Sequence, residues 1–376
     1  MISFIKNKIS SENKKYFAVI AIFALINIIL LTTAIHKFVS PFISDSYEYQ
    51  ETAKYLVGHG GAEIFPHRLL KPLAPLLFGL GSFFVDIKAS FLFVNSVFYF
   101  FIGFLIFKIT DLIFSNKRQA LISSIIFLSA YPMLEYGVSY MTDLSGWFFF
   151  ALSVYLTLLF LKKPGHKLAA LNGFVSALGM LCKESGGMGA LFFTLCVFFA
   201  LQESLSKKLK YFFVYVFSFL APFFLWQFFV YLRFHYSYYD WFLFNRGAGN
   251  KVYKNEIIKL VVKSLGASFL FGWIFAIYGT IKLYLAKEIT GKTKIIIAFL
   301  IPSSISFLLW FAASSRLFYI IGVLLSLFAG YGIISLVGNK YLQTGFVSAV
   351  LFVNYFWLIF DDKFRAVMNY FFNVHY

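Results

Sequence analysis

The segment Ala89–Phe107, ASFLFVNSVFYFFIGFLIF, contains no charged residue and few polar ones. A helix needs about 20 apolar residues to cross the hydrocarbon core of a bilayer, so this stretch predicts a transmembrane helix. Tyr16–Ile35, Leu144–Leu161 and Leu317–Val337 have a similar length and character. In total we predict eleven spans, all without a charged residue: 16–35, 89–107, 119–133, 144–161, 168–182, 187–202, 211–232, 264–281, 295–311, 317–337 and 342–360.

The composition excludes a soluble globular protein. Of the 376 residues, 60% are hydrophobic and 22% are aromatic, which is far from the usage of soluble domains. The apolar segments also lack the alternation that is typical of outer-membrane barrel strands. We therefore expect an all-α fold, a polytopic membrane helix bundle of about eleven transmembrane helices with a large first extracytoplasmic loop. Residues 1–376 are predicted to form a single domain, with no separate soluble domain.

The charges between the spans predict how the chain is oriented. With the N-terminus inside, the inner loops hold 18 of the 33 Lys and Arg residues but only 4 of the 16 Asp and Glu residues. Inner loops of membrane proteins carry such a positive excess, so we interpret the net charge of +17 as membrane orientation and expect no nucleic-acid partner. The expected location is integral and multi-pass, in the plasma membrane of a bacterium or the endoplasmic reticulum of a eukaryote.

Leu69–Val85 is the segment on which this orientation depends. Its clean apolar run begins only after Lys71 and Pro72 and has about 13 residues, which is short for a crossing. We interpret it as an interfacial or re-entrant helix on the outer face. If it spanned the bilayer, every later loop would change sides and the Lys-rich short loops would lie outside, against the positive-inside rule.

The outer segments 36–88, 134–143 and 233–263 are where a functional site is expected. Asp45 and Glu48 are three residues apart in the first of them and share one face if the segment is helical. They are either the cap and capping box of a helix start or a carboxylate general base with a neighbour that binds substrate. His67, Arg68 and Lys71 follow; their cations either reach lipid headgroups or hold a phosphate.

The shorter outer turns carry a second group of candidates. Asp143 either caps the next span or supplies a second carboxylate beside Asp45. Lys183 and Glu184 form either a mutual solvated pair or part of the mouth of a site. Arg316 directly precedes a long apolar span. Its planar guanidinium group either contacts lipid headgroups or binds a phosphate through pairs of hydrogen bonds.

The third outer segment interleaves aromatic and charged residues, from Arg233 to Arg246. Tyr and Trp gather at membrane interfaces without any ligand, and we favour that interpretation for Trp241 and its neighbours. The alternative is that these rings stack on sugars, with Arg246 as a further substrate-binding candidate.

Taken together, these motifs resemble the GT-C superfamily of membrane glycosyltransferases, in the bacterial branch similar to protein mannosyltransferases. The resemblance covers most of the chain and rests on short motifs in a fixed order. They are Asp45-x-x-x-Tyr49-x-x-x-Ala53, Arg68-x-x-x-Pro72, Tyr131-Pro132 with Thr142-Asp143, and Arg316 opening a helix that runs to Gly330-Tyr331-Gly332.

The resemblance implies a function at the outer face of the membrane. A sugar passes from a polyprenyl-phosphate donor to a glycan, lipid or protein acceptor. Asp45 is then the catalytic base of an inverting transfer, Asp143 shapes the acceptor or metal side, and Arg316 binds the lipid phosphate, with Arg68 and Lys183 as further candidates. No clear metal motif is present, so the need for a divalent cation, Mg²⁺ or Mn²⁺, is left open.

Two other classes of protein share the multi-span pattern. One is a flippase or transporter of lipid-linked glycans, and the other is a polysaccharide polymerase or ligase. Transporters usually place ionisable groups near the middle of the membrane, whereas the predicted spans contain none. The sequence therefore favours surface chemistry over transport.

Overall fold

The computed structural model describes residues 11–34, 45–60, 63–253, 257–286, 290–305 and 314–372. Every regular element in these ranges is a helix, which confirms the predicted all-α class. The elements are α2 (Ser11–Ile29), η1 (Leu30–Ala34), α3 (Asp45–Leu56), α4 (Pro66–Leu69), α5 (Leu73–Gly81), α6 (Ile87–Phe114), α7 (Lys117–Ser129), η3 (Met133–Gly137), α8 (Asp143–Lys162), α9 (His166–Cys182), η4 (Glu184–Met188), α10 (Gly189–Leu195), η5 (Cys196–Ala200), α11 (Leu205–Phe234), α12 (Tyr238–Tyr253), α13 (Ile257–Phe269), α14 (Gly272–Leu285), α15 (Gly291–Ile305), α16 (Ser315–Phe318), η7 (Tyr319–Ile321), α17 (Gly322–Leu336) and α18 (Lys340–Phe372).

Six helices of the described part are long and apolar enough to cross a membrane, so the protein is an integral membrane protein but the count of eleven is not confirmed. They are Lys14–Thr33, Ile87–Phe114, Asp143–Lys162, Leu205–Phe234, Tyr319–Leu336 and Lys340–Phe360. Other predicted spans form shorter pieces. The block 187–202 lies in η4, α10 and η5, and part of 295–311 lies outside the described residues.

The predicted span 264–281 is not one continuous helix. Val261–Phe269 and Gly272–Leu285 meet at an angle of 90°, and the break falls at Leu270, whose φ of 39° is left-handed. A residue in that conformation cannot continue a right-handed helix. The apolar pattern is continuous across the break, so hydropathy alone could not reveal it.

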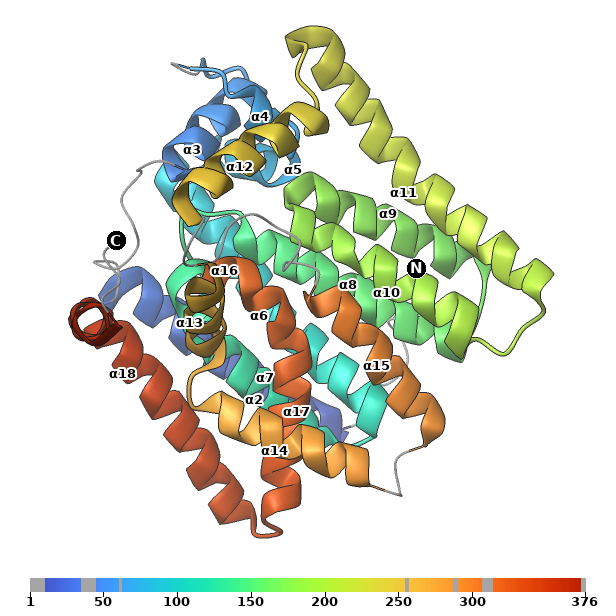
Figure 1. Ribbon diagram of the computed structural model, residues 1–376, viewed down its shortest axis with the longest axis vertical. Coiled ribbons are helices and arrows are strands. Elements are labelled where there is room, and N and C mark those ends of the chain that lie inside the picture. Colours follow the sequence, from blue (N-terminus) through green and yellow to red (C-terminus); the bar gives the residue numbers. More distant parts are fainter. Residues whose placement is uncertain are drawn as a thin grey trace.

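The segments predicted as outer loops contain helices of their own. In Figure 1, α3, α4, α5 and α12 gather at the top of the molecule, beside the upper end of α11. Leu73–Gly81 has 9 residues, which is too short to cross a bilayer. The interpretation of Leu69–Val85 as a non-spanning segment therefore agrees with the structure.

Close helix contacts through glycine hold the half of the bundle that contains α14 and α17. A Cβ built on Gly279 would lie 2.0 Å from the carbonyl oxygen of Phe328, and one on Gly332 would lie 2.2 Å from that of Phe275. Small residues let membrane helices approach at backbone distance, where van der Waals packing replaces the hydrophobic effect. The contact fixes α17, which follows α16, the short helix of Arg316, after the single turn η7.

A buried hydrogen-bond network joins α8, α9 and α11. Ser153 Oγ donates to Asn172 Oδ1 at 2.8 Å, Asn172 Nδ2 donates to Thr157 Oγ1 at 2.8 Å, and Tyr215 OH donates to Ser176 Oγ at 2.7 Å. All of these side chains are buried. Such bonds between membrane helices are worth about 1 kcal/mol each, and here they set the register of α8 against α9.

Candidate functional site

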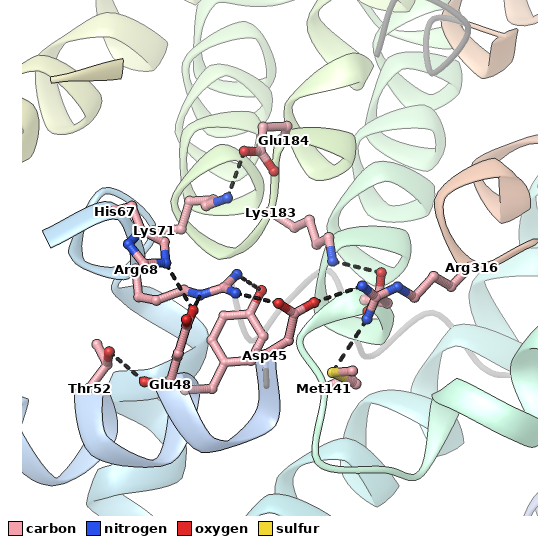
Figure 2. A network of polar contacts seen from close by, with 12 residues as sticks. Asp45, Glu48, Thr52, His67, Arg68, Lys71, Met141, Lys183, Glu184 and Arg316 are labelled. Atoms are coloured by element: carbon pink, nitrogen blue, oxygen red, sulfur yellow. Dashed lines mark hydrogen bonds and ion pairs between the residues drawn. The ribbon is translucent and has the colours of Figure 1, made fainter. Parts of the chain in front are cut away.

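Charged side chains from five elements converge at the end of the bundle covered by α3, α4 and α12. Figure 2 shows Asp45 from α3 between Arg68 from α4 and Arg316 from α16, with Lys183 and Glu184 from the α9–η4 junction close by. Asp143, the first residue of α8, completes the group. The outer segments far apart in the sequence therefore form one site, as predicted for residues that share a reaction.

Asp45 is held by two guanidinium groups. Its Oδ1 accepts a hydrogen bond from Arg68 Nη2 at 2.5 Å, and its Oδ2 accepts one from Arg316 Nη2 at 2.7 Å. Burial by itself raises the pKa of the Asp45 carboxyl, but the attraction of Arg68 and Arg316 outweighs it and holds that pKa well below its usual range. The carboxylate is therefore ionised at neutral pH and both of its oxygens are occupied.

Glu48 lies one turn along α3 and binds the other side of Arg68. Its Oε2 accepts from Arg68 Nε at 2.6 Å and lies 2.9 Å from His67 Nε2. Arg68 Nη1 donates to Tyr49 OH at 3.0 Å, and the guanidinium lies 4.5 Å from the centre of that ring. Asp45 and Glu48 thus bind cationic side chains, which favours the site interpretation over the capping box.

Asp143 and Lys183 form a buried ion pair between α8 and the end of α9. Lys183 Nζ donates to Asp143 Oδ1 at 2.7 Å, and the Asp143 side chain is only 1% exposed. Within the described residues Asp143 Oδ2 accepts no hydrogen bond, and Arg316 Nη1 lies 4.0 Å from it. Burial by itself lowers the pKa of the Lys183 amine, but Asp143 outweighs it and raises that pKa.

Glu184 binds Lys71 and Trp241, and the predicted solvated pair of Lys183 with Glu184 is wrong. Lys71 Nζ donates to Glu184 Oε1 at 2.6 Å, and Trp241 Nε1 donates to the same oxygen at 3.3 Å. Lys183 instead turns toward Asp143. The side chains of Lys183 and Glu184 point in different directions at the start of the short helix η4. Their adjacency in the sequence therefore did not mean that they pair with each other.

Trp241 is part of the site, so its interpretation as a membrane-interface residue is also wrong. Its ring stacks on His67 at 4.8 Å between centroids with an interplanar angle of 10°, and Lys71 Nζ lies 4.9 Å from the ring centre. The side chain is only 8% exposed. Arg246, on the same helix α12, has an exposed side chain and is not drawn into this network. Sequence reasoning named Arg246 and did not name Trp241 as a site residue, because aromatic composition does not say which ring faces inward.

The residues around Asp45 do not fit a divalent cation. Both Asp45 oxygens are bound by guanidinium groups, and the described residues contain no group of three or more His, Cys, Asp and Glu side chains that could hold a metal. A divalent cation prefers several carboxylate or carbonyl oxygens, and here it would face Arg68 and Arg316 at close range.

Comparison with known proteins finds a family match to part of the chain and a similar fold. The family model "Dolichyl-phosphate-mannose-protein mannosyltransferase" matches residues 72–226. Crystal structures of the Archaeoglobus fulgidus oligosaccharyltransferase are similar in fold. The complex with Zn and sulfate has a TM-score of 0.56 at 13% identity, covering 90% of this chain and 51% of that one. The apo form has a TM-score of 0.57 at 11% identity, covering 91% and 55%.

A third structure of the same oligosaccharyltransferase, tethered to an acceptor peptide containing the NVT sequon, has a TM-score of 0.51 at 11% identity and covers 90% of this chain and 53% of that one. The chain thus spans about half the length of the archaeal enzyme. No curated protein matches the sequence. The family match over residues 72–226 and the shared fold agree with the resemblance that the motifs indicate, and the long apolar helices make this chain an integral membrane protein.

Proposed function

We propose that the protein is a glycosyltransferase that moves a sugar from a polyprenyl-phosphate donor to a glycan, lipid or protein acceptor at the extracytoplasmic or lumenal membrane face. The observation that carries the proposal is the placement of Asp45 between Arg68 and Arg316. It puts a carboxylate beside two guanidinium groups, each of which can donate a pair of hydrogen bonds to phosphate oxygens. The matching family is named for mannosyl transfer from dolichyl phosphate to protein, which supports the same class of donor.

Each side chain has a distinct task in this reaction. The acceptor hydroxyl oxygen attacks the anomeric carbon while the bond from that carbon to the phosphate oxygen breaks, which inverts the configuration. Asp45 takes the acceptor proton as general base. Arg316, with Arg68 and Lys183, stabilises the negative charge that the departing polyprenyl phosphate gathers. Asp143, with its free Oδ2 beside Arg316, orients the acceptor.

An apolar groove supports a donor with a long lipid chain. The groove has a volume of about 830 Å³ and is lined by α11 residues such as Phe224 and Phe228 together with Tyr238 and Tyr239. Tyr238 precedes Trp241 by one turn of α12, so the groove leads from a membrane-crossing helix toward the charged site. A polyprenyl tail in this groove would lie beside the start of α12, the helix that carries Trp241.

Activity of the purified full-length chain in lipid nanodiscs tests the proposal. The protein is incubated with a panel of polyprenyl-phosphate sugars and membrane extracts, and mass spectrometry compares glycans and glycolipids with and without it. We expect Asp45→Asn to abolish transfer and Arg316→Ala to raise the KM for donor. Asp240→Asn is the matched control, because Asp240 only caps α12 through Ser237. Full transfer by Asp45→Asn would remove the base from the mechanism.

A further inference from the structure

The two guanidinium groups assigned to the donor phosphate are already neutralised inside the protein. Arg68 Nη2 and Arg316 Nη2 each donate to a different oxygen of Asp45, at 2.5 and 2.7 Å. The side chains of Arg68 and Arg316 are 7% and 22% exposed, whereas that of Asp45 is 30% exposed. The carboxylate is therefore the most accessible of the three side chains, and it lies between the two cations (Figure 2).

The charges that face Asp45 balance without a ligand. Arg68 on α4, Arg316 on α16 and Lys183 at the end of α9 are cationic. Glu48 on α3 and Asp143 on α8 pair with Arg68 and Lys183, and Tyr49 OH accepts from Arg68. His67 faces Glu48 rather than Asp45. A phosphate that enters adds a negative charge, and like charges crowded in a partly buried site repel.

A carboxylate clamped in this way is also a poor base. General-base catalysis is most effective when the pKa of the base lies near the working pH, whereas two guanidinium partners keep the proton affinity of Asp45 low. A reaction that uses Asp45 as base therefore needs a step that removes at least one of these partners. The donor phosphate can supply that step, because it competes for the same N–H groups.

We propose that Asp45 is an internal counter-ion that occupies the donor-phosphate site of the free protein and is displaced when the phosphodiester binds Arg316 and Arg68. The inference rests on the proposed function and adds an order of events to it. Donor binding transfers the guanidinium hydrogen bonds from the carboxylate to the phosphate oxygens. Asp45 then turns to the acceptor with its basicity restored, so the base becomes active only when donor is present.

Competition for the two arginines has a consequence that a simple catalytic base lacks. Removing the Asp45 charge should strengthen phosphate binding even though it abolishes transfer. The probe is methyl farnesyl phosphate, a phosphodiester with one negative charge and no sugar, titrated calorimetrically into the full-length protein in nanodiscs. We expect Asp45→Asn to bind the probe about tenfold more tightly or better, since close like charges weaken association strongly.

Control variants separate the inference from the proposed function. Asp240→Asn makes the same change at an exposed aspartate outside the site and should leave the affinity unchanged, and Arg316→Ala should weaken it. Asp45→Glu retains the competing charge and should not bind more tightly than wild type. If Arg316→Ala weakens binding but Asp45→Asn does not strengthen it, the counter-ion inference is overturned and the phosphate site stands. If neither substitution changes the affinity, the phosphate site itself is refuted.

A measurement on the wild-type protein tests the inference even if the variants do not fold. Infrared difference spectra of protein labelled with ¹³C at aspartate carboxyls are recorded with and without the probe. Loss of two guanidinium partners should shift the stretching band of one aspartate, and Asp143→Asn should leave that shift in place. Aspartate bands that do not change on saturation with the probe would overturn the inference.

Discussion

The Lys183–Asp143 pair makes the sharpest stability prediction, because it combines deep burial with good geometry. The substitution Lys183→Met keeps the length of the side chain and removes its charge. It leaves an Asp143 carboxylate that is 1% exposed and has lost a 2.7 Å partner. Removing one member of a buried pair typically costs about 3–5 kcal/mol. Arg316, 4.0 Å away, compensates part of the charge, so we expect about 3 kcal/mol.

The free energy of unfolding is measured by SDS titration in mixed micelles, followed by tryptophan fluorescence. Wild type, Lys183→Met, Asp143→Asn and the double variant form a cycle that isolates the interaction between the two side chains. We expect the double variant to be more stable than the sum of the two single losses predicts, by about 2 kcal/mol, because the second change removes the stranded charge.

Lys207→Met is the matched control for this cycle. Lys207 also pairs with a carboxylate, Glu203, at 3.0 Å, but its side chain is 59% exposed, and exposed pairs contribute about 0–1 kcal/mol. The argument that burial makes the Lys183–Asp143 pair important would be refuted by either of two results. One is an equal loss of unfolding free energy in Lys183→Met and Lys207→Met, and the other is strict additivity of the losses in the cycle.

Three further predictions follow from the contacts described above. Gly279→Val should abolish the folded, monodisperse peak in size-exclusion chromatography, because its Cβ meets a backbone carbonyl at 2.0 Å, whereas Gly345→Val, with no atom within 4 Å, should not. Trp241→Ala should speed hydrogen exchange in α12 at least several-fold by removing the His67 stack and the Glu184 hydrogen bond; unchanged exchange would mean that other contacts hold α12. The pKa of Asp45 is lowered in the folded state, so its contribution to stability is present above its unfolded value of 3.8 and is lost as pH falls further. Thermal unfolding should therefore show a shallower decline below pH 4 in Asp45→Asn than in wild type.

Most of the site could be predicted because its residues carry charge in a sequence whose spans carry none. A charged residue between apolar spans must lie at a membrane surface, and alternate loops share one surface. Asp45, Arg68, Asp143, Lys183 and Arg316 were found in this way, and the structure brings them together. The roles assigned to them remain predictions.

The errors have a common physical cause. Hydropathy reports that a residue prefers lipid or protein to water, but it does not report direction. It could not show the 90° break between α13 and α14, nor that Trp241 faces the site while Arg246 on the same helix is exposed. It also missed Lys71 as the partner of Glu184, since 113 residues separate the two.

The contact between Asp45 and Arg316 joins residues 271 positions apart. At a synthesis rate of roughly 5–20 residues per second, Asp45 leaves the ribosome roughly 15 to 55 s before its second partner exists. During that interval Asp45 can bind the guanidinium group of Arg68 but not that of Arg316. A nascent chain that has not yet formed α16 therefore lacks one of the two guanidinium groups that bind Asp45, and the charged cluster is complete only after Arg316 has been synthesised.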